Sequence, residues 1–238
     1  MSGTHTPNIR RDTGGSVRGT AVRLVVLDMA GTTVTDDGLV ERAFAAALPG
    51  HDAQQLDLVR RTMGESKITV FRRLLDGDEQ AARQANTAFE RACAELVADG
   101  ACTALPGAEE AVRRLRGQGR AVVLTTGFSR TTQDAVLTAL GWHDLADLTL
   151  CPADAGRGRP HPDLVLTALL RTAAADDVRQ VAVSGDTAAD MRTGVRAGAS
   201  VVAGVLTGAH RAPALRDAGA THVLGSVAEL PDLLTALD

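Results

Sequence analysis

Short runs of apolar residues recur along the chain and are separated by stretches with helical spacing. The first run, Arg23–Asp28, ends in a carboxylate and is followed by Gly31 and Thr32, which is typical of a buried strand leading into a loop. Similar runs follow at 121–127, 147–152, 181–186, 200–208 and 221–225. Helical patterns lie between them at 108–119, 131–141, 162–173, 188–198 and 212–219. Strands that are apolar throughout and alternate with helices predict an α/β fold with a doubly wound parallel sheet.

One long segment, residues 36–103, interrupts this alternation. It contains no convincing strand and includes helical patterns at 39–48, 66–75 and 80–99. An insert after the first strand would lie above the carboxyl ends of the strands, where open sheets bind ligands. The alternative is that the segment forms part of one continuous core. We predict that 36–103 is a small helical cap domain and that 21–35 and 104–238 form the α/β core domain.

Composition narrows the classes of function. The 238 residues are 45% hydrophobic with a net charge of -4, which supports a sizeable core and gives no basic footprint for nucleic acid. No apolar run is long enough to predict a membrane span. Residues 1–20 are polar, lack the apolar stretch of a signal peptide and are predicted to be a flexible tail. The three cysteines lack metal-ligand spacing and suit a reducing cytoplasm, which is the expected location.

Polar residues occur in four sets that each follow a predicted strand. The sets are Asp28–Thr33, Thr125–Gly127, Gly156–Asp163 and Gly185–Asp190. Each set alone has an ordinary explanation as a turn, a helix cap or a solvated loop. Because the carboxyl ends of parallel strands converge at one edge of a sheet, we expect the four sets to lie together. Their order along the chain therefore predicts a single site.

The first three sets supply groups suited to phosphorus chemistry. Asp28 can act as a nucleophile toward phosphorus and form an acyl-phosphate that water later breaks. Gly31 permits a sharp turn whose backbone N–H groups can hold phosphate oxygens. The hydroxyl and free N–H of Thr126-Gly127 can bind a phosphoryl oxygen without adding charge. A cation such as Arg159 can balance the nucleophile and the anionic phosphorus group.

The fourth set suggests a metal. Asp186 and Asp190 are four residues apart and straddle a predicted strand-to-helix turn, so both can face one cavity. Together with Asp28 they supply the hard oxygen ligands that Mg²⁺ prefers. The expected cofactor is therefore Mg²⁺.

These motifs, LDMAGTT, LTTG, GRPHPD and GDTAAD, resemble those of the haloacid dehalogenase superfamily of phosphohydrolases and span residues 24 to about 208. The resemblance implies a Rossmann-like core and an aspartyl-phosphate on Asp28. It also implies that Thr126 and Arg159 contact the phosphate, with Gly31, Thr32 and Gly127 beside them. Asp186 would be a Mg²⁺ ligand, and Asp190 would be a ligand or hold the water shell of the metal.

The residue at position 30 differs from the residue usual in the phosphatases of that superfamily. They usually carry a second Asp two residues after the nucleophile, and this Asp protonates the leaving oxygen. The residue here is Ala30, whose backbone carbonyl could still be a Mg²⁺ ligand. Either the leaving group needs no acid from this position, or the enzyme is slow or inactive.

The phosphonatase branch, phosphonoacetaldehyde hydrolase and its relatives, is similar at this position. Its nucleophile motif reads Asp-x-Ala-Gly-Thr-Thr, and a lysine in its cap forms a Schiff base with the substrate aldehyde. The segment Met63–Ile68 matches that cap motif, which places Met63 in the substrate site and Lys67 at the lysine position. Lys67 is the only lysine in the chain. The resemblance is incomplete, because Val70 stands where the branch has a cap histidine and Gly38-Leu39 does not match its cap cysteine.

Three functions stay open. The first is hydrolysis of the carbon–phosphorus bond of a phosphonoaldehyde through a Lys67 Schiff base. The second is hydrolysis of a small phosphate monoester, with Lys67 gripping an anionic group. The third is a catalytically retired relative that binds but does not react. The expected partner is a small phosphorylated or phosphonate metabolite, not a nucleic acid or a membrane, and a homodimer is left open.

Overall fold

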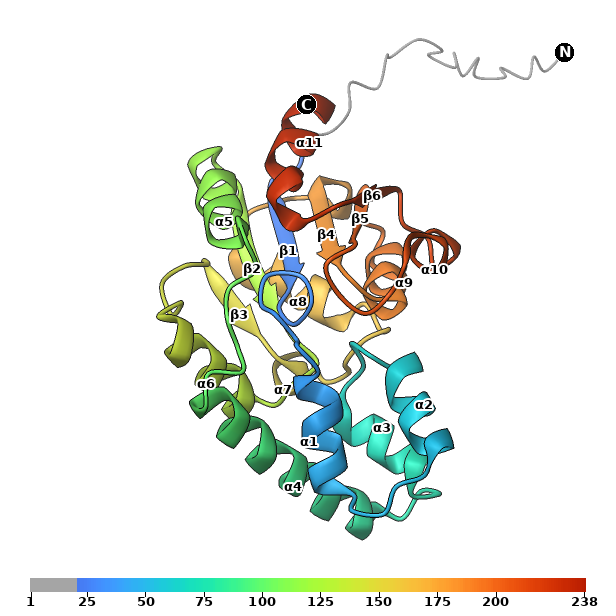
Figure 1. Cartoon of the computed structure of the whole chain (residues 1–238). Coiled ribbons are helices and arrows are strands. Elements are labelled where there is room, and N and C mark those ends of the chain that lie inside the picture. Colours follow the sequence, from blue (N-terminus) through green and yellow to red (C-terminus); the bar gives the residue numbers. More distant parts are fainter. Residues whose placement is uncertain (1–20) are drawn as a thin grey trace, which may run out of the picture.

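A six-stranded sheet lies at the centre of the computed structural model, which describes residues 21–238 (Figure 1). All strands are parallel and follow the order β3-β2-β1-β4-β5-β6. Their bounds are β1 Leu24–Asp28, β2 Ala121–Thr125, β3 Leu148–Leu150, β4 Val181–Gly185, β5 Val201–Val205 and β6 His222–Leu224. The predicted doubly wound parallel sheet is thus confirmed. The predicted flexible tail, 1–20, lies outside the described residues.

Strand β1 shows why the apolar runs form buried strands. It lies between β2 and β4, and all five of its residues are buried. Val25 and Leu27 belong to a hydrophobic cluster on one face of the sheet, whereas Leu24 and Val26 belong to the cluster on the other. Successive side chains of a strand point to opposite faces, so a central strand must be apolar at every position.

Helices cover both faces of the sheet. Their bounds are α5 Ala108–Gly117, α6 Arg130–Leu140, α7 Pro152–Ala155, α8 Asp163–Thr172, α9 Ala188–Ala197, α10 Ala212–Asp217 and α11 Leu230–Leu237, with short 3₁₀ turns η1 Val178–Gln180 and η2 Val227–Glu229. The apolar sides of α5, α6 and α11 join the cluster on one face, and α8 joins the cluster on the other. The five predicted helices are confirmed, while the sequence pattern does not indicate α7 or α11.

The segment between β1 and α5 is helical and lies beyond the carboxyl ends of the strands (Figure 1). Its helices are α1 Leu39–Ala47, α2 Ala53–Arg61, α3 Lys67–Leu74 and α4 Glu79–Ala98. The segment begins and ends at one place, because the Thr35 N–H donates to the Thr103 carbonyl at 2.8 Å. We call α1–α4 and their connecting loops the helical insert. Its division from the core as a separate domain, 36–103, stays a prediction.

The helical insert packs around three phenylalanines. The ring centroids of Phe44 and Phe89 lie 6.0 and 5.9 Å from that of Phe71. These rings belong to the same hydrophobic cluster as Val25 and Leu27 of β1, so apolar packing is continuous from the sheet into the insert. Among residues 21–238, none of the helices combines the length and apolar character that crossing a membrane requires.

We expect Phe71→Ala to destabilise the protein by about 3–5 kcal/mol, because it leaves a cavity between two rings. Phe71 is only 2% exposed. The free energy of unfolding in urea measures the change. Leu170→Ala is the control, since Leu170 is 80% exposed, and we expect it to alter stability by no more than about 0.5 kcal/mol. Equal effects of the two substitutions would contradict this account of the insert.

Candidate active site

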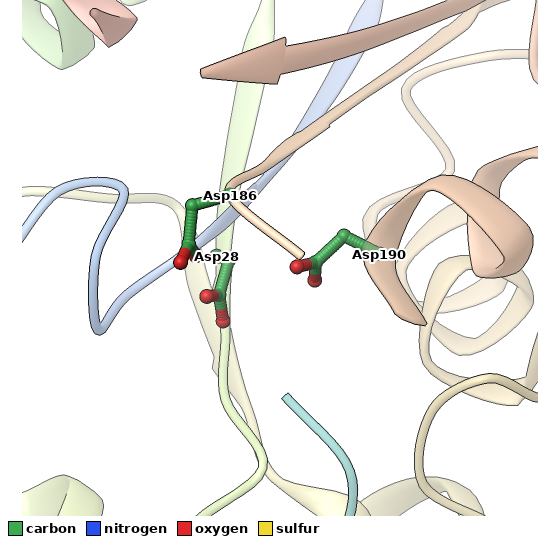
Figure 2. A group of neighbouring side chains, drawn as sticks. All are labelled: Asp28, Asp186 and Asp190. Carbon is green, nitrogen blue, oxygen red and sulfur yellow. The ribbon is translucent and has the colours of Figure 1, made fainter. Parts of the chain in front are cut away.

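Three carboxylates meet at the carboxyl edge of the sheet (Figure 2). Asp28 is the last residue of β1, Asp186 directly follows β4, and Asp190 lies in the first turn of α9. One oxygen from each lies within 4.8 Å of the others, and all three residues are buried. The structure therefore brings together the three acidic residues that the sequence predicts as metal ligands.

A single buried guanidinium lies against this acidic group. Arg159, in the loop between α7 and α8, places Nη1 2.7 Å from Asp28 Oδ1 and Nε 2.9 Å from Asp190 Oδ1. Its Nη2 donates to Thr125 Oγ1 at 2.6 Å, which fixes the plane of the guanidinium. One positive charge thus faces three carboxylates, and the buried group keeps an excess of negative charge when all are ionised.

The two carboxylates after β4 accept hydrogen bonds from neighbouring groups. Asp186 accepts from Thr32 Oγ1 at 3.2 Å and from the Ala209 N–H at 2.7 Å. Asp190 accepts from the N–H of Thr187 at 3.1 Å. The backbone of Gly31 runs close beside Asp186: its φ is +83°, and a Cβ there would lie 2.5 Å from Asp186 Oδ2. A glycine is therefore required at this turn.

Burial also shifts the titration of these carboxylates. Desolvation raises the pKa of Asp28 well above its ordinary value, with Arg159 opposing and the other two carboxylates adding to the rise. Desolvation, aided by the charge of Asp190, raises the pKa of Asp186 to about 6. A cation beside such a buried carboxyl group would stabilise its ionised form. In the part of the chain the structure describes, no backbone N–H donates to the Ala30 carbonyl, which leaves a further oxygen beside them. These donors fit a divalent cation that prefers oxygen ligands.

A cavity of about 460 Å³ adjoins the acidic group and extends toward the helical insert. Eight of the predicted site residues line it: Asp28, Ala30, Met63, Lys67, Thr126, Gly127, Arg159 and Asp186. The remaining predicted residues do not line it. Gly31 and Thr32 lie beside Asp186, and Asp190 pairs with Arg159. The cavity thus joins groups from the sheet edge to groups from the insert.

Lys67 is the first residue of α3 and lines this cavity from the insert side. Its side chain is half-buried, and its Nζ lies 5.8 Å from the centroid of the Phe128 ring. Among the described residues its amine has no hydrogen bond or ion pair. Desolvation lowers the pKa of Lys67, while the charges of Asp36 and Asp28 oppose that change. The amine is therefore more easily neutral than that of an exposed lysine.

The loop between α2 and α3 lies directly on the core. A Cβ on Gly127 would lie 2.8 Å from the carbonyl oxygens of both Gly64 and Glu65. A Cβ on Gly158 would lie 2.9 Å from the Cβ of Ser66. Missing side chains thus allow two core loops to approach the insert backbone, and the contact forms part of the cavity wall beside Lys67.

Several residues of the site are not indicated by the sequence motifs. Asp36 is among them, together with the segment Thr207–Ala209, whose Thr and Gly repeat the pattern of Thr126-Gly127 after another strand. That repeat is a signal from which Thr207–Ala209 could be found. Thr125 and Thr187 lie within the predicted sets, but the motifs indicate no role for either; Thr125 accepts from Arg159, and Thr187 donates to Asp190. Asp36 follows no strand, and only the position of the insert brings it to the cavity.

Comparison with known proteins identifies the class that this fold and site define. A family model for haloacid dehalogenase-like hydrolases matches residues 22–198. The chain therefore belongs to the haloacid dehalogenase-like hydrolases and is an enzyme of that superfamily.

Relatives within the family differ in their activities. The protein named Probable phosphatase IndB, from Dickeya dadantii, is 28% identical over 90% of this chain and 94% of its own length. Phosphonoacetaldehyde hydrolase from Bacteroides fragilis is also 28% identical, over 91% of this chain and 97% of its own. The crystal structure of a phosphonoacetaldehyde hydrolase-like protein from Oleispira antarctica superposes with a TM-score of 0.79 and 23% identity, covering 96% of both chains. The two relatives are thus named for phosphate and phosphonate hydrolysis, and the structural likeness shows that the fold is shared.

We expect Gly127→Ala to displace the loop between α2 and α3, because the new methyl group would meet two backbone oxygens that cannot rotate away. Amide hydrogen exchange of residues 63–66 measures the effect, and faster exchange is the expected result. Gly117→Ala is the matched control, since nothing lies within 4 Å of a Cβ at that helical position. We expect that variant to exchange normally and to gain about 0.5–1 kcal/mol of stability. Unchanged exchange in Gly127→Ala would show that the contact does not hold the loop.

Proposed function

We propose that this hydrolase is a phosphonatase-like, Mg²⁺-dependent enzyme that breaks the carbon–phosphorus bond of a phosphonoaldehyde through a Schiff base on Lys67. The observation that carries the proposal is the position of Lys67. The only lysine of the chain presents an unpaired amine to the cavity that contains Asp28. The similarity to phosphonoacetaldehyde hydrolase of Bacteroides fragilis supports the same assignment.

The chemistry explains why an amine is needed. Carbon leaves phosphorus readily only if the electron pair of the broken bond is delocalised. The neutral amine of Lys67 would add to the aldehyde and lose water, and the resulting iminium would accept that pair as an enamine. Asp28 would attack phosphorus, and water would then release phosphate from the aspartyl intermediate. No acid is needed at Ala30 in this sequence of steps, because the leaving group is carbon and not an alkoxide oxygen.

The remaining groups would bind and orient the phosphonate. Arg159 would balance its charge, with Thr126 and Gly127 as donors to its oxygens and Met63 against its carbon part. The expected phosphate contacts of Gly31 and Thr32 do not fit, because their N–H groups donate to the carbonyls of Val34 and Met29. Asp28, Asp186, Asp190 and the carbonyl of Ala30 would hold the Mg²⁺. The ion, when bound, supplies positive charge that stabilises the transferring group. We further propose a cytoplasmic location, with which the three free cysteines agree.

A phosphatase acting on a small phosphate monoester is the second candidate. The observation in its favour is that Lys67 lines the same cavity as Asp28. As an ammonium, Lys67 would bind an anionic group of the substrate, and the other residues of the site would keep the roles given above. The similarity to the Dickeya dadantii phosphatase covers nearly the whole chain and favours it equally. The two functions differ in whether Lys67 acts through its nucleophilic nitrogen or through its charge.

Substitution of Lys67 by Arg separates these candidates, because Arg keeps the charge but cannot form an imine at neutral pH. With phosphonoacetaldehyde as substrate, we expect phosphate release to fall to the background rate in Lys67→Arg and in Asp28→Asn. Borohydride should trap an adduct on Lys67 in the wild type and in Asp28→Asn, as seen by peptide mass spectrometry. Phosphate monoester turnover that survives Lys67→Arg, without any adduct, would favour the phosphatase.

Mg²⁺ should stabilise the folded protein because it neutralises buried negative charge. At about 100 times its dissociation constant, the expected gain is about 2.7 kcal/mol, or a rise in Tm of about 5–10 °C for a chain of this size. Asp186→Asn should raise the Tm of the metal-free protein and abolish most of the Mg²⁺ effect, whereas Asp217→Asn, on the exposed end of α10, should keep it. A Tm that does not respond to Mg²⁺ in the wild type would contradict the metal site.

A further inference from the structure

We propose that Asp36 is the proton acceptor and donor for Lys67 during imine formation, an inference that rests on the proposed Schiff-base function. Schiff-base chemistry needs a group that removes a proton from the ammonium and later protonates the departing oxygen. Neither Ala30 nor Val70, at the positions where relatives carry an acid and a histidine, can transfer protons. Asp36 is a carboxylate of the same cavity that the metal cluster does not use.

Asp36 and Lys67 both line the main cavity, and Lys67 is the first residue of α3. Asp36 lies three residues before the start of α1, and its Oδ1 accepts from the Val40 N–H at 3.3 Å. Val40 and Lys67 line two cavities together, the main one and a small one of about 10 Å³ within the insert. The hydrogen bond to Val40 therefore fixes the Asp36 carboxylate on the part of α1 that lies against the Lys67 side chain.

Both groups lack a competing partner. Among residues 21–238 no arginine, histidine or lysine nitrogen lies within 4.0 Å of the Asp36 carboxylate, and no carboxylate oxygen lies that close to the Lys67 amine. Most arginines near the cavity are engaged elsewhere: Arg60 pairs with Glu41, and Arg159 pairs with Asp28 and Asp190. The two groups are thus free to exchange a proton with each other or with a substrate between them.

The electrostatics of the surroundings favour this exchange. Burial raises the pKa of Asp36, and the charges of Glu41 and Asp37 raise it further. The charge of Lys67 lowers this pKa more than any other charge. Burial lowers the pKa of Lys67, and the charge of Asp36 opposes that change more than any other charge, ahead of Asp28; the thiol of Cys93, on α4, also faces the amine. The two pKa values therefore move toward each other, which makes proton transfer between the groups easier.

Cys93 is excluded as the proton acceptor. Burial raises the pKa of its thiol to about 12, so the thiol stays protonated at neutral pH. Asp28 and Arg159 also face Lys67, but both belong to the group that binds phosphorus.

Two further carboxylates line the cavity: Glu41 pairs with Arg60, and Asp37 is exposed and is not among the charges that shift the pKa of Lys67. Asp36 is then the cavity carboxylate best placed to exchange a proton with Lys67.

The proposed steps balance. The Asp36 carboxylate takes one proton from the Lys67 ammonium, which gives a neutral amine and a carboxylic acid. The amine nitrogen forms a bond to the carbonyl carbon, and one of its protons passes to the carbonyl oxygen, which gives a carbinolamine. Asp36 then protonates the hydroxyl, the carbon–oxygen bond breaks, and water leaves. The products are the iminium on Lys67, one water and the Asp36 carboxylate, so the net change is ammonium plus aldehyde to iminium plus water.

The test compares Asp36→Asn with Asp37→Asn. The first keeps an oxygen acceptor for the Val40 N–H, so the start of α1 is preserved, and the second removes the same charge from the exposed neighbour. Acetaldehyde, which lacks phosphorus, is trapped on Lys67 with borohydride, and the rate is followed by peptide mass spectrometry. We expect the rate to fall by about 10²-fold or more in Asp36→Asn, to stay unchanged in Asp37→Asn, and to recover partly in Asp36→Glu.

A second measurement does not depend on reactivity. Reductive methylation with ¹³C-formaldehyde labels Lys67 and the terminal amine only, because the chain has one lysine, and NMR titration then gives the pKa of Lys67 directly. Loss of the Asp36 charge should lower that pKa further, and loss of the Asp37 charge should not. Equal trapping rates and an equal Lys67 pKa in the wild type and Asp36→Asn would overturn the role of Asp36 alone. A wild-type protein that traps no acetaldehyde on Lys67 would overturn the Schiff-base function as well.

Discussion

The burial of three carboxylates beside one guanidinium is the constraint on which the rest of this structure depends. Arg159 contacts Asp28 and Asp190 directly, yet it cannot neutralise all three acids. Desolvated charges of one sign cost free energy, and apolar packing of the sheet must offset that cost. The site is therefore suited to a further positive charge. The raised pKa of Asp28 reflects desolvation and the excess of buried negative charge.

The second constraint is the close contact between the helical insert and the core. The loop between α2 and α3 reaches the core where Gly127 and Gly158 leave room for its backbone. This contact forms part of the cavity wall beside Lys67, and burial of the Lys67 amine lowers its pKa. Close packing at Gly127 and Gly158 thus bears on the protonation of Lys67. Excluding water favours the neutral amine, which is the form that can attack a carbonyl.

The sequence predicts most of the sheet and of the acidic cluster, for physical reasons. A strand buried on both faces must be apolar throughout, and residues at the ends of parallel strands must converge, so Asp28 and Asp186 could be placed together from pattern alone. Helix α2 could not be predicted from the sequence, because Val59 is its only buried residue and one buried residue forms no apolar stripe. The position of Asp36 in the cavity could not be predicted either, because it depends on how α1 and α3 pack and not on a local motif. The roles assigned to these residues, and the domain boundary at 36–103, stay predictions.

The place of β1 in the sheet also bears on how the chain is made. Leu24 pairs with Ala121 and with Val181, so β1 is synthesised well before both of the strands that lie beside it. During that interval the apolar residues of β1 are exposed, and long-range pairing of this kind slows folding and invites aggregation. The helical insert is synthesised in the meantime and shares a hydrophobic cluster with β1. It is thus the first apolar partner that is available to cover that strand, before the two strands beside it are made.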